Sequence, residues 1–148
     1  MTDSALAISN LVLHYAELMD LGDFAGVGRI FTHAAITTDL SDEVRLGAAL
    51  AQEQFETWTR RYPDNGTPHT KHVTTNLIIE VEPGATVATA RSYFTVFQQV
   101  GGLALQPIIA GRYHDEFAII EGEWSFTKRH YISELFGDLS QHLLRPIE

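Results

Sequence analysis

The sequence predicts a single α+β domain in which a strongly curved antiparallel sheet wraps around N-terminal helices to form a cone. Helical patterns dominate the first 62 residues, and four strand-like runs with tight turns between them follow over residues 72–132. Helices that precede a sheet in this way are typical of the α+β class. A length of 148 residues suits one domain, residues 1–148, with a sizeable core.

The helical half contains three predicted helices and one short strand. In the first helix, Asp3 or Ser4 can cap the start, and Gly22 fits a C-terminal cap that would end the helix at about Leu21. Asp23 can cap the short second helix. We expect the second helix over residues 24–31, the short strand over residues 34–40 and the third helix over residues 47–62.

The second half is predicted to be an antiparallel meander of long strands. Pro83-Gly84 and Gly101-Gly102 supply two of the turns, and an isolated Gly111 within a strand favours a bulge there. The expected strands cover residues 72–82, 86–100, 103–120 and 124–132. A curved sheet closed by helices leaves a cone whose mouth can hold a small ligand.

The composition excludes several classes of function. A net charge of −9 argues against binding to nucleic acid and to anionic membrane surfaces. The chain has no cysteine, which excludes disulfides, thiol nucleophiles and thiolate metal sites. It also has no apolar run of about 18 residues, and its first ten residues lack the basic start and apolar block of a secretory signal. We therefore expect a cytoplasmic protein.

Asp20 occupies an unfavourable place at the end of the first helix. The negative end of the helix dipole repels a carboxylate, and no Lys or Arg between Met1 and Gly28 offsets this repulsion. Either Asp20 is simply solvated, or another part of the chain needs a carboxylate at this position.

Four short stretches, in this order, resemble the nuclear transport factor 2-like superfamily, also called cystatin-like. The stretches are YAELMDLGDF at 15–24, KHVTTNL at 71–77, GRYHDEF at 111–117 and EGEW at 121–124. More narrowly, the chain is similar to the SnoaL-like branch, which includes scytalone dehydratase, hexachlorocyclohexane dehydrochlorinase and bile acid 7-alpha-dehydratase. The resemblance covers nearly the whole chain and implies the cone-shaped α+β barrel.

The resemblance also implies a catalytic site made of Asp20, His72 and Tyr15. In these lyases an aspartate at the end of a helix orients a histidine that removes a proton from the substrate, and Asp20 and His72 stand at the matching positions. An ion pair of this kind gains roughly 4 kcal/mol at an effective dielectric of 20, more than the roughly 0.3–1 kcal/mol that the helix dipole costs. Tyr15, five residues before Asp20, would polarise a substrate oxygen through its phenol, although it also fits the apolar core face of its helix.

The direction of the His72 side chain is left open by the sequence. Strict alternation along the strand places His72 on one face with Thr74 and Asn76, and Val73, Leu77, Ile79 and Val81 on the other. If the apolar face lines the cone, His72 points outward unless a bulge or the start of the strand redirects it.

Two alternatives come from other functional classes. Ketosteroid isomerase has the same fold and carries its general base near the position of Asp39, so an isomerase or a polyketide-cyclase-like enzyme could use Asp39 with Tyr15, and Asp115 could be a second acid. A non-catalytic binding or accessory domain is the other alternative, and a filled pocket with Asp20 and His72 more than ~6 Å apart would favour it.

Aromatic and charged residues complete the expected surfaces. His69 and His72 are three residues apart and would point to opposite faces of an extended segment, so we expect neither a metal nor any other cofactor. Arg91, Arg112, Lys128 and Arg129 are expected in cross-strand ion pairs on an exposed or dimer face. We expect the remaining lining of the site to be Trp58, Asn76, Phe94, Tyr113, Tyr131 and Asp39.

Together, these features predict a cofactor-independent lyase of the dehydratase type. His72 would abstract a proton, Asp20 would orient it, and Tyr15 would hold an oxygen of a small, mostly apolar cyclic or aromatic molecule. The outer face of the sheet would form a homodimer or a higher homo-oligomer.

Overall fold

The computed structural model describes residues 3–147 and confirms the α+β fold class. Helix α1 is capped by the Asp3 side chain and closed by Gly22 in the left-handed region, at φ 74°. Asp23 caps α2 through a hydrogen bond to the backbone of Gly26. The helices are α1 (Ser4–Leu21), α2 (Phe24–Ile30) and α3 (Gly47–Trp58), and the strands are β1 (Ala35–Thr38), β2 (Ser41–Leu46), β3 (Thr70–Glu80), β4 (Val87–Val100), β5 (Leu103–Ile120) and β6 (Glu123–Phe136).

The six strands form one sheet in the order β2-β1-β6-β5-β4-β3. The meander from β3 to β6 is antiparallel, as predicted, whereas β1 pairs with β6 in parallel. Strand β2 was not predicted, because its residues are mostly exposed and carry no apolar alternation. The third helix ends four residues earlier than expected, since Thr59 leaves the helix to pair with Leu143 near the C-terminus.

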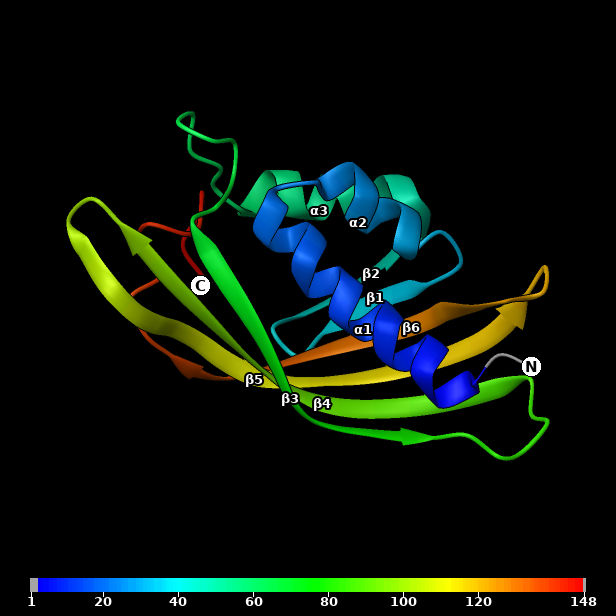
Figure 1. Ribbon diagram of the computed structural model, residues 1–148. Helices are drawn as coiled ribbons and strands as arrows, with labels where there is room; N and C mark the ends of the chain where they lie inside the picture. The colour runs from blue at the N-terminus through cyan, green and yellow to red at the C-terminus, as the bar shows by residue number, and fades with distance from the viewer. Residues whose placement is uncertain (1–2, 148) are drawn as a thin grey trace.

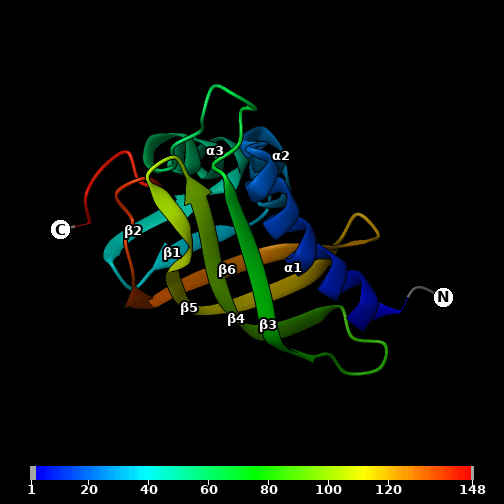
Figure 2. The ribbon, with the colours of Figure 1, turned by 60° about the vertical axis from the view of Figure 1, so that its left-hand side comes forward.

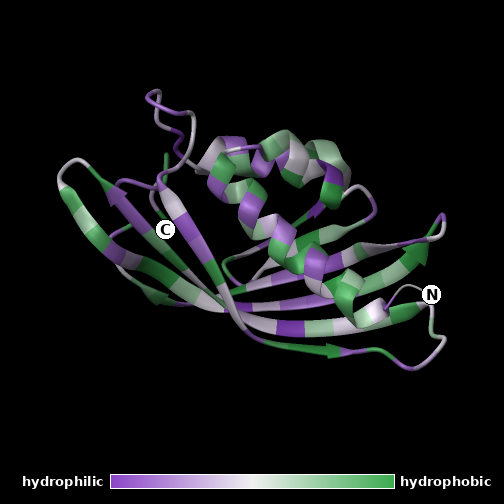
Figure 3. Cartoon of the chain, in the orientation of Figure 1, coloured by the Kyte–Doolittle hydropathy of each residue, from purple (hydrophilic) through white to green (hydrophobic). Residues whose placement is uncertain are grey.

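The sheet bends strongly, and the three helices lie on its concave side (Figure 1). Helix α1 crosses the concave face, while α2 and α3 pack together beyond it, as the rotated view also shows (Figure 2). Hydrophobic and hydrophilic residues alternate along the long strands (Figure 3), as expected for strands with one buried face. The core therefore lies between the helices and the concave face of the sheet.

Bulges interrupt the regular pairing at two positions that affect the cavity. Register shifts occur at Ala110/Gly111 on β5, which confirms the bulge expected at Gly111, and between Thr75 and Ile78 on β3. A side chain at Gly111 would lie 2.0 Å from the carbonyl oxygen of Ile132, so this close approach of two strands requires glycine. Within residues 3–147, no helix combines the length and apolar character needed to cross a membrane.

Candidate active site

A cavity of about 690 Å³ lies between the helices and the concave face of the sheet. Its lining combines apolar and aromatic side chains with polar and charged ones, among them Glu43, Arg45 and Arg145, and its size suits a small molecule. The predicted residues that line it are Tyr15, Trp58, His72, Phe94, Tyr113 and Tyr131. A second hollow of about 630 Å³ is bounded only by residues between Phe136 and Ile147 and contains none of the predicted site residues.

Asp20 and His72 meet at the wall of this cavity. Asp20 Oδ1 lies 2.6 Å from His72 Nδ1, and Oδ2 accepts a hydrogen bond of 2.8 Å from the backbone N–H of His72. The hydroxyl of Thr70 donates a further hydrogen bond of 2.9 Å to Oδ1. Both side chains of the pair are largely buried, with exposed fractions of 11% and 7%. Asp20 therefore receives three hydrogen bonds from one end of β3, which compensate for its place at the helix end.

The three hydrogen bonds keep Asp20 ionised. Burial by itself would raise the pKa of this carboxyl, but the hydrogen bonds from His72 and Thr70 and the charge of His72 outweigh burial and lower the pKa below its ordinary value. An ionised carboxylate can only accept hydrogen bonds, so the hydrogen between the two groups belongs to His72 Nδ1. In the neutral imidazole, Nε2 then carries the free lone pair.

A bulge directs His72 into the cone. Asn76 adopts a positive φ of 54° at the register shift on β3, and this changes which residues face inward. Before the bulge the inner face carries His72 and Thr74, whereas after it the inner face carries Leu77 and Ile79. Val73 is exposed, so the alternation expected from sequence holds only in part.

Three tyrosines from different elements gather beside His72. The Tyr15 and His72 ring centroids are 6.2 Å apart in an edge-to-face arrangement, and the hydroxyl of Tyr131 donates a hydrogen bond of 3.0 Å to that of Tyr15. Tyr113 packs edge-on against the rings of Tyr15 and Tyr131. Burial is the largest cause that raises the pKa of each of these phenols, so all three remain protonated hydrogen-bond donors. Tyr15 thus belongs to the core and also lines the cavity.

The expectation that Arg129 lies on an exposed face was wrong. Its side chain is fully buried and forms two hydrogen bonds to Asp115, of 2.8 and 2.9 Å. Its guanidinium carbon lies 3.8 Å from the ring centroid of Tyr113 and 4.5 Å from that of Tyr15. Burial would lower the pKa of Arg129, but the Asp115 carboxylate more than reverses this and keeps the group charged. A permanent positive charge therefore lies beneath the tyrosines.

The other charged strand residues are where they were expected. Arg91 pairs with Glu80, Arg112 with Glu134 and Lys128 with Glu116, and all three pairs are partly or largely exposed. Asp115 does not line the cavity, because both of its carboxylate oxygens are bound to Arg129.

Asn76 and Asp39 lie outside the cavity, contrary to the expectation for the site. Asn76 is exposed because it occupies the bulge that turns its neighbours inward. Asp39 is exposed at the turn between β1 and β2, and its carboxylate accepts a hydrogen bond of 3.2 Å from the backbone N–H of Ser133. Neither residue is placed to contact a ligand in the cavity.

Sequence reasoning missed His142, a further histidine that lines the cavity. Its exposed fraction is 7%, and burial, followed by the charge of the nearby His72, lowers its pKa to about 4. His142 follows the last strand in a segment without secondary-structure pattern, so the only available signal was the residue type itself.

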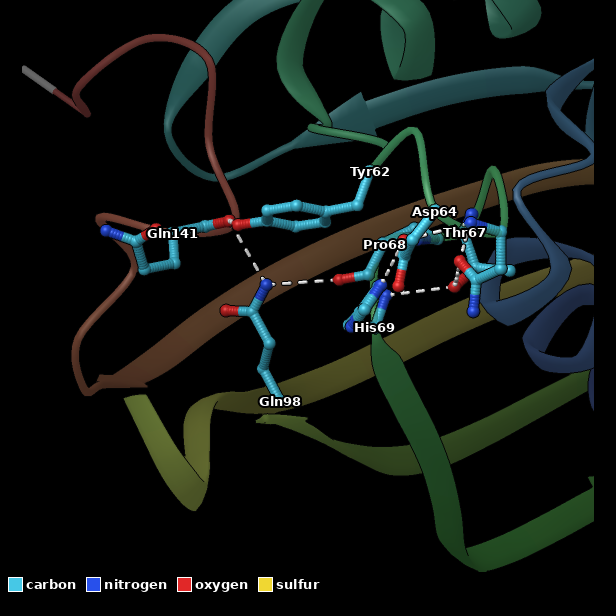
Figure 4. Close-up of polar contacts among 8 residues, drawn as sticks. Tyr62, Asp64, Thr67, Pro68, His69, Gln98 and Gln141 are labelled. Atoms are coloured by element: carbon cyan, nitrogen blue, oxygen red, sulfur yellow. Dashed lines mark hydrogen bonds and ion pairs between the residues drawn. The ribbon is translucent and has the colours of Figure 1, made fainter. Parts of the chain in front are cut away.

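No metal-binding cluster of three or more His, Cys, Asp or Glu occurs among residues 3–147. His69, three residues before His72, instead lies 2.8 Å from Asp64 Oδ1 on the loop before β3 (Figure 4). His130 Nδ1 likewise forms a hydrogen bond of 2.7 Å with the hydroxyl of Thr37.

The sequence matches a known protein family. A model of the SnoaL-like domain matches residues 1–130. The chain belongs to the SnoaL-like family. The match ends before His142, and no curated protein matches the sequence.

Solved structures with this fold include a candidate enzyme and a protein of unknown function. A candidate scytalone dehydratase from Novosphingobium aromaticivorans is 19% identical, with 90% of this chain and 86% of that chain covered and a TM-score of 0.70. ActVI-ORFA from Streptomyces coelicolor is 17% identical, with 90% and 98% covered and a TM-score of 0.70. A variant of Rv3472 from Mycobacterium tuberculosis, a protein of unknown function, is 23% identical, with 88% and 71% covered and a TM-score of 0.70. At these identities the likeness shows the fold alone.

Proposed function

We propose that this SnoaL-like chain is a cofactor-independent lyase that removes water or another small leaving group from a small, mostly apolar cyclic compound. The observation that carries the proposal is the 2.6 Å contact between Asp20 Oδ1 and His72 Nδ1 at the wall of a ligand-sized cavity. A carboxylate that fixes one nitrogen of an imidazole leaves the other nitrogen ready to remove a proton.

The reaction starts from a cyclic ketone with a hydroxyl group on the β carbon. His72 Nε2 takes a proton from the α carbon, and the electron pair of the C–H bond moves into an enolate. The enolate forms a C=C bond as the C–O bond to the hydroxyl breaks. The imidazolium returns its proton to the departing hydroxide, so water leaves and His72 is neutral again. Asp20 stabilises the imidazolium between these two proton transfers.

The tyrosines would stabilise the enolate oxygen. The Tyr131 hydroxyl donates to the Tyr15 oxygen, and the Tyr15 hydroxyl would turn from its neighbour Tyr113 to donate to a substrate oxygen. Arg129 lies beneath the rings as the positive partner of the buried Asp115 pair, and its guanidinium would favour negative charge that develops next to the phenols. The candidate scytalone dehydratase among the similar structures shares the fold that this proposal needs.

The alternatives receive less support. An isomerase that uses Asp39 as its base needs this carboxylate in the cavity, and Asp39 lies outside it. A plain binding domain was expected to have a filled pocket and a separated pair, whereas the cavity is open and Asp20 contacts His72.

The test is turnover of cyclic β-hydroxy ketones, followed by the ultraviolet absorbance of the conjugated enone. His72→Ala should lower kcat by about 10²–10⁴-fold and keep the circular dichroism spectrum. Asp39→Asn is the matched control and should retain the wild-type rate. The reverse pattern, an inactive Asp39→Asn and an active His72→Ala, would reject the lyase and favour the isomerase or cyclase.

A further inference from the structure

The segment after the last strand, residues 138–147, forms one wall of the cavity. Six of its residues line the cavity, and His142 is the one among them with an imidazole. The segment has no regular secondary structure. It crosses the wide end of the cone beside the chain that leaves α3 (Figure 2), where residue Leu143 pairs with Thr59.

The segment is anchored through its backbone on both sides of His142. The buried Gln98 side chain donates to the carbonyl oxygens of Pro68 and Gln141, each at 3.1 Å, and the Tyr62 hydroxyl also donates to that of Gln141 (Figure 4). The backbone N–H of Arg60 donates to the carbonyl oxygen of His142 at 2.8 Å. The position of His142 is therefore fixed independently of its imidazole.

The imidazole of His142 is buried, but one of its nitrogens lacks the hydrogen-bond partner that a buried polar atom normally has. Its Nδ1 is inaccessible to solvent and has no hydrogen-bond partner within residues 3–147. Buried polar atoms are normally paired, so an unpaired imidazole in a residue that lines the cavity is a feature that a ligand can complete once the ring turns a nitrogen toward the cavity. Burial lowers the pKa of the ring and keeps it neutral, which leaves it one N–H donor and one acceptor.

We propose that His142 is a second substrate-contacting residue and hydrogen-bonds a hydroxyl group of the ligand while the tyrosines hold its carbonyl oxygen. The inference rests on the proposed function and deepens it, because it names a residue that binds a hydroxyl group of the cyclic hydroxy ketone. The phenols come from α1, β5 and β6, and His142 comes from the C-terminal segment, so the cavity presents hydrogen-bonding groups from two separate parts of the chain. His142 is neutral and does not remove the proton, which His72 does.

The experiment measures equilibrium binding with a matched pair of probes, 1-tetralone and 4-hydroxy-1-tetralone. They share a bicyclic skeleton and differ by one hydroxyl group, which lies on the γ carbon and is therefore not eliminated when an α proton is removed. Trp58 lines the cavity, so quenching of tryptophan fluorescence reports binding. The wild-type protein should bind the hydroxylated probe about 5–10-fold more tightly, which is the range of one hydrogen bond. In His142→Phe this preference should disappear, while the Kd for 1-tetralone changes less than about twofold.

A second readout follows the imidazole directly. The ¹H–¹³C resonance of the His142 ring, assigned by its absence in His142→Phe, should shift with the hydroxylated probe and much less with 1-tetralone. His142→Gln keeps a donor and an acceptor and should retain part of the preference, which covers the case in which His142→Phe does not fold.

Several outcomes would overturn the inference. If His142→Phe binds both probes more weakly by the same factor, His142 only helps to form the wall of the cavity. If His142→Phe still binds the hydroxylated probe more tightly than 1-tetralone, the hydroxyl group binds at another residue. A wild-type protein that binds neither probe, or both equally, would also reject it. Since binding is measured without turnover, a failed lyase assay with a preserved preference would reject the proposed function and leave the role of His142 standing.

Discussion

Asp20 Oδ1 lies 2.6 Å from His72 Nδ1, so the last turn of α1 and the first residues of β3 share one hydrogen-bonded pair. The two residues are 52 positions apart in the chain. Asp20 also accepts hydrogen bonds from the backbone of His72 and the hydroxyl of Thr70. The pair therefore has one fixed geometry, and the imidazole cannot rotate without losing its contact with the carboxylate.

Replacing the Asp20 carboxylate should leave the fold intact and remove the group that orients the His72 imidazole. Asp20→Asn can still accept from the backbone of His72, but its amide no longer stabilises the imidazolium or selects the Nδ1–H tautomer. We expect kcat for enone formation to fall by about 10²–10⁴-fold with little change in KM. Asp23→Asn, which keeps a capping side chain, is the matched control. An unchanged kcat in Asp20→Asn would argue against the pairing as the source of catalysis.

The Tyr15 hydroxyl should affect catalysis more than folding. Tyr15→Phe keeps the buried ring and its aromatic contacts and removes the hydroxyl that we propose as the donor to the substrate oxygen. Loss of one oxyanion donor predicts a fall in kcat of about 10²–10³-fold. The free energy of unfolding, measured in urea, should fall by only about 1 kcal/mol, which is the contribution of the hydrogen bond from Tyr131. Tyr93→Phe alters an exposed phenol and should keep the wild-type rate.

Breaking the buried ion pair of Arg129 and Asp115 should lower the free energy of unfolding more than removing both of its charges. Arg129→Met leaves the Asp115 carboxylate buried without its partner and should lower the free energy of unfolding by about 3–5 kcal/mol. The double variant Arg129→Met with Asp115→Leu removes both charges and should recover much of that loss. If the single and double variants were equally destabilised in urea melts, packing rather than charge would explain the effect.

His142 predicts how stability depends on pH. The pKa of its imidazole is about 4 in the fold and about 6.5 when unfolded, so the unfolded chain binds the proton more tightly. Stability should therefore be full above about pH 6.5 and fall as the pH drops toward 4, by up to about 3 kcal/mol. Asp20 and His72 are the charged groups that act on this ring, and Asp20 loses its own contribution only at lower pH, below its ordinary pKa.

The measurement is urea unfolding at pH 7 and pH 4.5 for the wild type, His142→Phe and His33→Gln. The slope between the two pH values should become shallower in His142→Phe alone, because His33 is exposed. A slope that is equal in all three proteins would exclude His142 as the titrating group.

The sequence predicted the helices and the meander because these depend on local patterns. Of the residues that line the cavity, it predicted Tyr15, Trp58, His72, Phe94, Tyr113 and Tyr131. Caps at Asp3, Asp23 and Gly22 lie next to the helices they close, and the apolar alternation of the strands is local as well. The placement of Asp20 beside His72 came from the resemblance, since no local pattern joins residues so far apart. The parallel pairing of β1 with β6 and the position of β2 depend on contacts that no short window contains.

The missed features have physical causes that can be named. The inward direction of His72 depends on the bulge at Asn76, whose positive φ is not encoded by a glycine. Asp115 lies on the same face of β5 as Tyr113 and Phe117, but it was predicted only as a possible second acid, and its partner Arg129 was assigned to the surface on charge alone. The homo-oligomer, the cofactor independence and the cytoplasmic location stay predictions.

The most direct test of the account is hydrogen–deuterium exchange at the α carbon of a cyclic ketone bound in the cavity. This step needs only the base, its orienting carboxylate and the phenols, and it does not depend on the identity of the leaving group. The protein in D₂O should accelerate loss of the α-proton signals of 2-tetralone in NMR spectra, and His72→Gln should abolish the acceleration. Equal exchange rates for the wild type, His72→Gln and buffer alone would contradict the claim that Asp20 and His72 form a base.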